Sequence, residues 1–183
     1  FDFVKALVSV AHPDFTVAVS LNSDVDSEHN RIIGNDSFYR TLKGIHNLAL
    51  FRQKIEIRTV IHKLTHQRLP NLAEFICRNF PFVVHVALMG LEPVGRALDN
   101  IEQLWIDPYD YRNTLKNAVQ VLHRNNLKVS IYNHQLCILL PSLRGFARKS
   151  IGSWKAIYLG ICEQCKLKDG CAGLFASAQL IHS

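Results

Sequence analysis

Short apolar segments rich in β-branched residues alternate along the chain with longer segments of helical periodicity. Four segments have the composition of strands and cover residues 16–21, 55–62, 83–91 and 128–136. Three segments between them repeat apolar side chains at helical spacing and cover residues 37–52, 71–79 and 110–125. Asn71 is the expected N-cap of the second helix, with Glu74 three residues later. This order of strands and helices predicts right-handed βαβ units and a parallel sheet.

Each predicted strand has one apolar side, which should face the covering helices. These side chains are Val17, Val19, Leu21, Ile55, Ile57, Ile61, Val84, Val86, Leu88, Val129 and Ile131. The alternate side chains should then face a barrel interior; they are Ser20, Asn22, Glu56, Arg58, His62, His85, Ala87, Met89, Ser130, Tyr132 and His134. We expect the polar ones to gather at the carboxyl ends of the strands, where such folds bind ligands. Each also has a structural explanation, since Arg58 could pair with Glu56 and any single histidine could be a hydrogen-bonded core residue.

The number of strands also bears on the fold. Four βα units are too few to close a barrel, and the strand at residues 16–21 would present a long apolar edge. We therefore expect upstream strands, so that this chain is the C-terminal portion of a larger protein. The predicted fold is α/β, with a partial (β/α) barrel over residues 1–136 and a cysteine-bearing appendage over residues 137–183.

Composition narrows the function only slightly. The chain has 183 residues, 48% of them hydrophobic, which suits one sizeable core. No apolar run approaches the roughly 18 residues of a membrane-spanning helix, so no membrane partner is expected. The net charge of +6 is spread along the chain, which does not indicate a nucleic-acid-binding surface. An odd number of cysteines without a secretion signal favours a reducing compartment, and hence a cytoplasmic location.

Three of the five cysteines lie close together near the C-terminus. Cys162, Cys165 and Cys171 form the pattern C-x2-C-x5-C, whose thiolates would suit zinc or an iron–sulfur cluster. Three ligands leave either site incomplete, so a fourth is expected from Cys137 first or from His182 second. The alternatives are reduced thiols clustered by chance, or a disulfide pair with a spare thiol.

Longer motifs are spread over nearly the whole chain. They are Val19-Ser20-Leu21-Asn22, Glu28-His29-Asn30, Ser37-Phe38, the strand from Ile55 to His62, Asn79-Phe80-Pro81-Phe82, the segment from Ala87 to Pro93, Leu104-Trp105-Ile106-Asp107-Pro108, Ser130-Ile131-Tyr132-Asn133 and Leu136-Cys137. Together they resemble radical S-adenosyl-L-methionine (SAM) enzymes, specifically the maturases of His-Xaa-Ser repeat peptide systems. The C-x2-C-x5-C pattern is similar to the auxiliary-cluster segments of peptide-modifying members, called SPASM or twitch domains.

This resemblance implies roles for individual residues. Ser20 and Asn22 match positions that hydrogen-bond the ribose or methionine moiety of SAM, and Arg58 suits a carboxylate of SAM or of substrate. Met89 and Glu92 belong to the cofactor-binding set, on the segment whose residues 90–93 would line the adenine.

The cysteines have implied roles as well. Cys137, Cys162, Cys165 and Cys171 would hold one auxiliary 4Fe–4S cluster. The position of a further SPASM cysteine is Phe175 in this chain, and Cys77 is expected in the core.

The implied activity is hydrogen abstraction from a ribosomal peptide with His-Xaa-Ser repeats, through a 5′-deoxyadenosyl radical derived from SAM. A companion maturase is a further implied partner. The C-x3-C-x2-C motif that holds the SAM-cleaving cluster is absent from these 183 residues, so the chain alone should be inactive. The alternative is a non-catalytic βα domain with a four-cysteine zinc site that binds a peptide or a partner protein.

Overall fold

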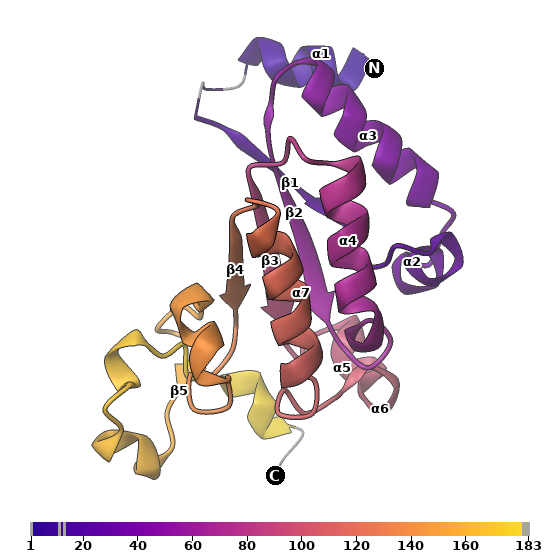
Figure 1. The fold of residues 1–183 in the computed structure, drawn as a ribbon. Coiled ribbons are helices and arrows are strands. Elements are labelled where there is room, and N and C mark those ends of the chain that lie inside the picture. The colour runs from indigo at the N-terminus through magenta and orange to yellow at the C-terminus, as the bar shows by residue number, and fades with distance from the viewer. Residues whose placement is uncertain (1, 11, 13, 181–183) are drawn as a thin grey trace.

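A four-stranded parallel sheet forms the centre of the protein, in a computed structural model that describes residues 2–10, 12 and 14–180. The strands are β1 (Thr16–Ser20), β2 (Lys54–Ile61), β3 (His85–Gly90) and β4 (Val129–Tyr132), and they lie in chain order. All three neighbouring pairs are parallel. Each connection therefore returns the chain to the end of the sheet at which the strands begin. This arrangement confirms the α/β class and the partial β/α fold (Figure 1).

The helices of the described chain are α1 (Asp2–Val10), α2 (Asp26–Ile33), α3 (Phe38–Leu50), α4 (Leu69–Asn79), α5 (Arg96–Asp99), α6 (Ile101–Leu104) and α7 (Arg112–Arg124). The three long ones, α3, α4 and α7, are those that the periodicity predicts, and they cover one face of the sheet (Figure 1). Asn71 is not the N-cap of α4. The helix begins two residues earlier, with Pro70 in its first turn, where a missing N–H leaves no hydrogen bond unmade.

The main core lies between the sheet and these helices. From the strands, Ile55, Ile57, Ile61, Val86, Leu88, Val129 and Ile131 are buried as predicted. They pack in one cluster with Leu72 and Ile76 of α4 and with Leu115 and Leu122 of α7. Val84 departs from the prediction because it comes before the first residue of β3, and its side chain is 40% exposed.

The opposite face of the sheet is open among the described residues. Ser20 and Arg58 are exposed there, and Glu56 and His85 are partly buried. Ser20 and Tyr132 are the last residues of β1 and β4 and His62 follows β2 directly, whereas Glu56 and Arg58 lie within β2 and His85 begins β3. β4 ends earlier than predicted, at Tyr132, because Asn133 has a positive φ of 63°. His134 therefore lies in a buried turn beyond the strand.

The C-terminal part of the chain consists of short turns and one small hairpin. Its elements are η2 (Pro141–Phe146), β5 (Ala156–Ile157), η3 (Gly160–Gln164), η4 (Lys168–Gly170), β6 (Leu174–Phe175) and η5 (Ala176–Leu180). β5 and β6 pair antiparallel and enclose a small second core around Ile151 and Phe175. Within the described residues, no helix combines the length and the apolar character needed to cross a bilayer.

The packing of α7 against the sheet predicts a large difference between two leucine substitutions. Leu115 is 0% exposed, so Leu115→Ala should lower the free energy of unfolding by about 2–5 kcal/mol. The control is Leu50→Ala at the end of α3, where the side chain is 72% exposed and the loss should stay below about 0.5 kcal/mol. Urea denaturation measures both values, and equal losses would contradict this placement of the core.

A cysteine-lined cavity as the candidate functional site

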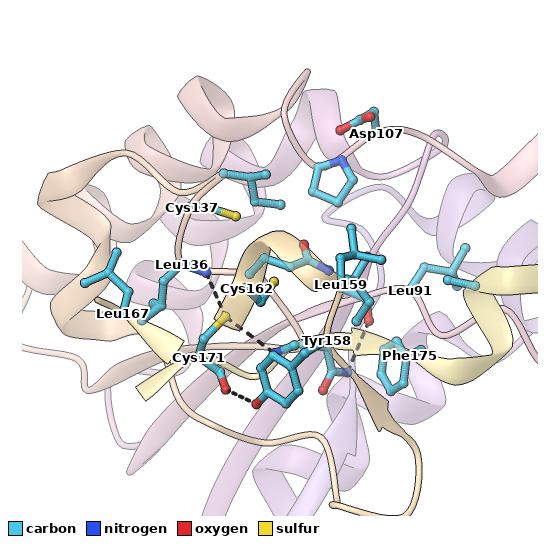
Figure 2. Close-up of a pocket in the computed structure, with 18 of the residues that line it drawn as sticks. Leu91, Asp107, Leu136, Cys137, Tyr158, Leu159, Cys162, Leu167, Cys171 and Phe175 are labelled. Atoms are coloured by element: carbon cyan, nitrogen blue, oxygen red, sulfur yellow. Dashed lines mark hydrogen bonds between the residues drawn. The ribbon is translucent and has the colours of Figure 1, made fainter. Parts of the chain in front are cut away.

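A cavity of about 320 Å³ lies at the carboxyl ends of the strands. Ile61 and Gly90, the last residues of β2 and β3, line it from the sheet, and Asn133 follows β4 directly. The C-terminal segment forms the facing wall, with Tyr158, Leu159 and Phe175 among its lining residues (Figure 2). The cavity is thus at the edge of the sheet where α/β folds bind ligands.

Cys137, Cys162, Cys165 and Cys171 all line this single cavity. Tight turns bring the last three together: η3 contains Cys162, and the Cys165 N–H donates to the Cys162 carbonyl at 3.2 Å. The η4 turn ends at Cys171, whose N–H donates to the Lys168 carbonyl at 3.1 Å. Cys137 comes from the loop after β4, directly after Leu136, whose N–H donates to Cys171 Sγ (Figure 2). Residues that the sequence spreads over 35 positions therefore meet at one cavity.

The sulfur of Cys171 accepts two backbone hydrogen bonds. The N–H groups of Leu136 and Gly173 each donate to Cys171 Sγ at 3.4 Å (Figure 2). The Tyr158 hydroxyl donates to the Cys171 carbonyl at 2.8 Å, which fixes the backbone of the same residue. These contacts hold the sulfur of Cys171 in a defined position at the cavity.

The four thiols influence one another electrostatically. Partial burial raises the pKa of the Cys137 thiol, and the neighbouring Cys171, Cys162 and Cys165 raise it further. In the described part of the chain, however, no three Cys, His, Asp or Glu side chains are close enough to hold a single metal ion. A zinc ion needs each sulfur at about 2.3 Å.

A buried polar pair supports the sheet side of the cavity. Tyr111 lines the cavity, and its hydroxyl donates to Nε2 of His134 at 2.8 Å. Nδ1 of His134 carries the hydrogen, because it donates to the Tyr132 carbonyl at 2.7 Å, and Nε2 is therefore the acceptor. Burial raises the pKa of Tyr111, with the Asp107 carboxylate adding to the effect, and burial lowers the pKa of His134 to about 4. Both groups are therefore neutral at physiological pH.

Gly90 is required at this point for steric reasons. A Cβ atom there would lie 2.7 Å from the Asn133 carbonyl oxygen and 3.2 Å from Cε1 of His134. The end of β3 can therefore approach the turn after β4 only as glycine.

The other residues expected to bind the cofactor lie away from the thiols. Ser20 and Arg58 are on the open face of the sheet, and Arg58 forms an ion pair with Glu56. Asn22 is buried after β1. Met89 is partly buried on β3, and the Glu92 carboxylate accepts hydrogen bonds from Lys155 at 2.9 and 3.1 Å.

The segment around Glu92 nevertheless contributes to the site, because Gly90, Leu91 and Pro93 line the cavity. The Lys155–Glu92 ion pair ties this segment to the C-terminal part of the chain. Cys77 packs against the main core, in agreement with the expectation. His182, the second candidate for a fourth ligand, lies outside the described residues.

Sequence reasoning missed the apolar and tyrosine lining of the cavity, including Tyr111, Tyr158 and Leu159. These residues have no spacing motif, and they meet only because the C-terminal segment folds back over the ends of the strands.

The fold, but no sequence relative, connects the chain to known proteins. No protein-family model matches it, and no curated protein does. Among solved structures, it is similar to a domain of pyruvate-formate lyase-activating enzyme from Bacteroides vulgatus ATCC 8482. The TM-score is 0.53 and the sequence identity 14%, with 71% of this chain and 73% of that chain covered. At this identity the likeness shows that the two share a fold.

Two buried histidines predict that stability depends on pH. Burial lowers the pKa of His134 to about 4, and burial with the nearby His66 lowers that of His62 to about 4, against 6.5 for the ordinary group. The unfolded chain then binds more protons below pH 6.5, so stability falls as the pH decreases toward 4. Between pH 7 and 5 each histidine should cost about 2 kcal/mol. Urea denaturation at the two pH values tests this, and equal stability would contradict it.

Proposed function

We propose that this chain is part of a radical SAM peptide-modifying enzyme and that its cysteine cavity holds an auxiliary 4Fe–4S cluster. The observation that carries the proposal is the convergence of Cys137, Cys162, Cys165 and Cys171 on one largely apolar cavity at the carboxyl edge of a parallel sheet. Four cysteine thiolates are the ordinary ligand set of such a cluster.

The surroundings of the thiols support a cluster rather than incidental clustering. The two N–H donors to Cys171 Sγ fix the position of that sulfur at the cavity. Leu136 and Leu167, which pack with the main core, would limit the access of water to a bound cluster from that side, which tunes its reduction potential. A zinc ion accepts the same four thiolates, so the metal content separates this alternative from the cluster.

The fold supports the enzyme class. One solved structure with a similar fold is a domain of pyruvate-formate lyase-activating enzyme, which belongs to the radical SAM family. The motifs that resemble His-Xaa-Ser maturases favour a peptide substrate, with a companion maturase as partner and a cytoplasmic location. When bound, SAM with its own cluster supplies the hydrogen-abstracting chemistry.

The residues of this chain would then bind the auxiliary cluster, SAM and the substrate and orient them. The thiols hold the auxiliary cluster, and the Tyr111–His134 pair and Gly90 keep the wall of the cavity rigid. Ser20, Asn22 and Arg58 are proposed to bind SAM or substrate on the side of the sheet opposite the helices. Arg58 is 51% exposed and directed by Glu56, which leaves its guanidinium accessible to a carboxylate.

Cysteine replacement tests the cluster. Cys165→Ala should abolish retention of iron and sulfide after anaerobic reconstitution, because the cavity loses one of its four thiols. Cys77→Ala, which removes a thiol on α4, should retain the wild-type amount. Iron, sulfide and zinc analysis of desalted protein provides the measurement. Zinc bound in place of iron would support the non-catalytic alternative, and equal metal in both variants would refute the ligand assignment.

A further inference from the structure

Three polar side chains form a continuous hydrogen-bonded row across neighbouring strands on the open face of the sheet. Glu56 on β2 contacts His85 on β3, with 2.6 Å between Oε2 and Nδ1. His85 in turn contacts Ser130 on β4, with 2.9 Å between Nε2 and Oγ. A hydroxyl within reach of an imidazole that a carboxylate orients is the geometry of an activated serine nucleophile.

The charge on Glu56 sets the direction of these hydrogen bonds. Burial raises the pKa of this carboxyl, but hydrogen bonds and charge from Arg58 and His85 outweigh it and lower the pKa below its ordinary value. Glu56 is therefore ionised at neutral pH and accepts a hydrogen bond from His85 Nδ1–H. In the neutral imidazole, Nε2 is then free to accept the Ser130 O–H. This is the tautomer that general-base catalysis requires.

The row borders a cleft that is separate from the cysteine cavity. The cleft has a volume of about 630 Å³ and shares no lining residue with that cavity. His85 and Ser130 line it, although Ser130 is only 3% exposed, and Lys128 and Arg148 are on its exposed part. In the described part of the chain, no Asp or Glu lines the cleft and neither cation has an ion-pair partner. Such a cleft favours a ligand with an anionic group.

We propose that Glu56, His85 and Ser130 form an acyl-transfer site that hydrolyses an ester carrying an anionic group. Ser130 Oγ attacks the ester carbonyl carbon while its proton passes to His85 Nε2. The carbon–oxygen bond to the alcohol then breaks, and the alcohol leaves with that proton. A water molecule attacks the acyl-serine by the same route, which releases a carboxylic acid and restores Ser130. Lys128 and Arg148 supply positive charge for the developing oxyanion and for the anionic group. This activity does not depend on the proposed cluster.

A fluorophosphonate probe tests the nucleophile on the intact chain, because it labels activated serines. Mass spectrometry should find the adduct on Ser130 in the wild type and none in Ser130→Ala. Ser142→Ala, at an exposed serine in η2, is the matched control and should be labelled like the wild type. Glu56→Gln should slow labelling about a hundredfold, since it removes the charge that orients His85. Melting curves establish that each variant is folded.

A hydrogen-bonded row with a purely structural role gives a different result. Folded wild type would then remain unlabelled at Ser130, or Glu56→Gln would be labelled at the wild-type rate, and either outcome overturns the proposal. The substrate class is tested with two p-nitrophenyl esters, one with a terminal carboxylate and one neutral. Wild type should prefer the anionic ester and Lys128→Ala should lose at least part of that preference; equal hydrolysis of both esters by wild type refutes the assigned substrate.

Discussion

Parallel pairing of the four strands is the constraint from which the rest of the architecture follows. Because β1 to β4 run in the same direction and in chain order, every connection must return across the sheet, and α3, α4 and α7 do so on one face. That face becomes the main core, and the other remains open among the described residues. The same pairing gathers all the strand ends at one edge, so the loops that leave β2, β3 and β4 enclose a common space.

The two candidate sites use different parts of this frame. The cysteine cavity depends on the ends of the strands. Gly90 permits the close approach of the turn at Asn133, and the β5–β6 hairpin closes the cavity from the other side. The Glu56–His85–Ser130 row depends instead on lateral register, since Glu56 lies directly opposite His85 in the β2–β3 pair. A shift of one residue in that register would turn these side chains into the core. The sheet therefore positions the Glu56–His85–Ser130 row directly, whereas the cysteines are held by the loop after β4 and by the turns of the C-terminal segment.

Sequence patterns predicted the parts of this structure that depend on local periodicity. Phe38 and Ile45 fall on the buried face of α3, and Ile55 and Ile57 face the helices, because burial imposes the period of each element. The C-x2-C-x5-C spacing predicted a shared site for three thiols, and all three line one cavity, although their role as ligands stays a prediction. The apolar lining of the cavity was not predictable, since Tyr111 and Leu159 are brought together by tertiary packing. The end of β4 was misjudged because an Asn with positive φ interrupts an otherwise strand-like run. The sequence showed only that Glu56, His85 and Ser130 alternate with apolar residues along their strands. Their hydrogen bonds could not be predicted, because they depend on the register between neighbouring strands.

The central claim is that the four thiols around the cavity act as one ligand set for a multinuclear cluster. Mössbauer spectroscopy of the whole chain, reconstituted anaerobically with isotopically enriched iron, tests it most directly. The account predicts a single 4Fe–4S cluster per chain with the parameters of all-cysteine ligation. Spectra of mononuclear iron, or of unbound iron alone, would contradict it.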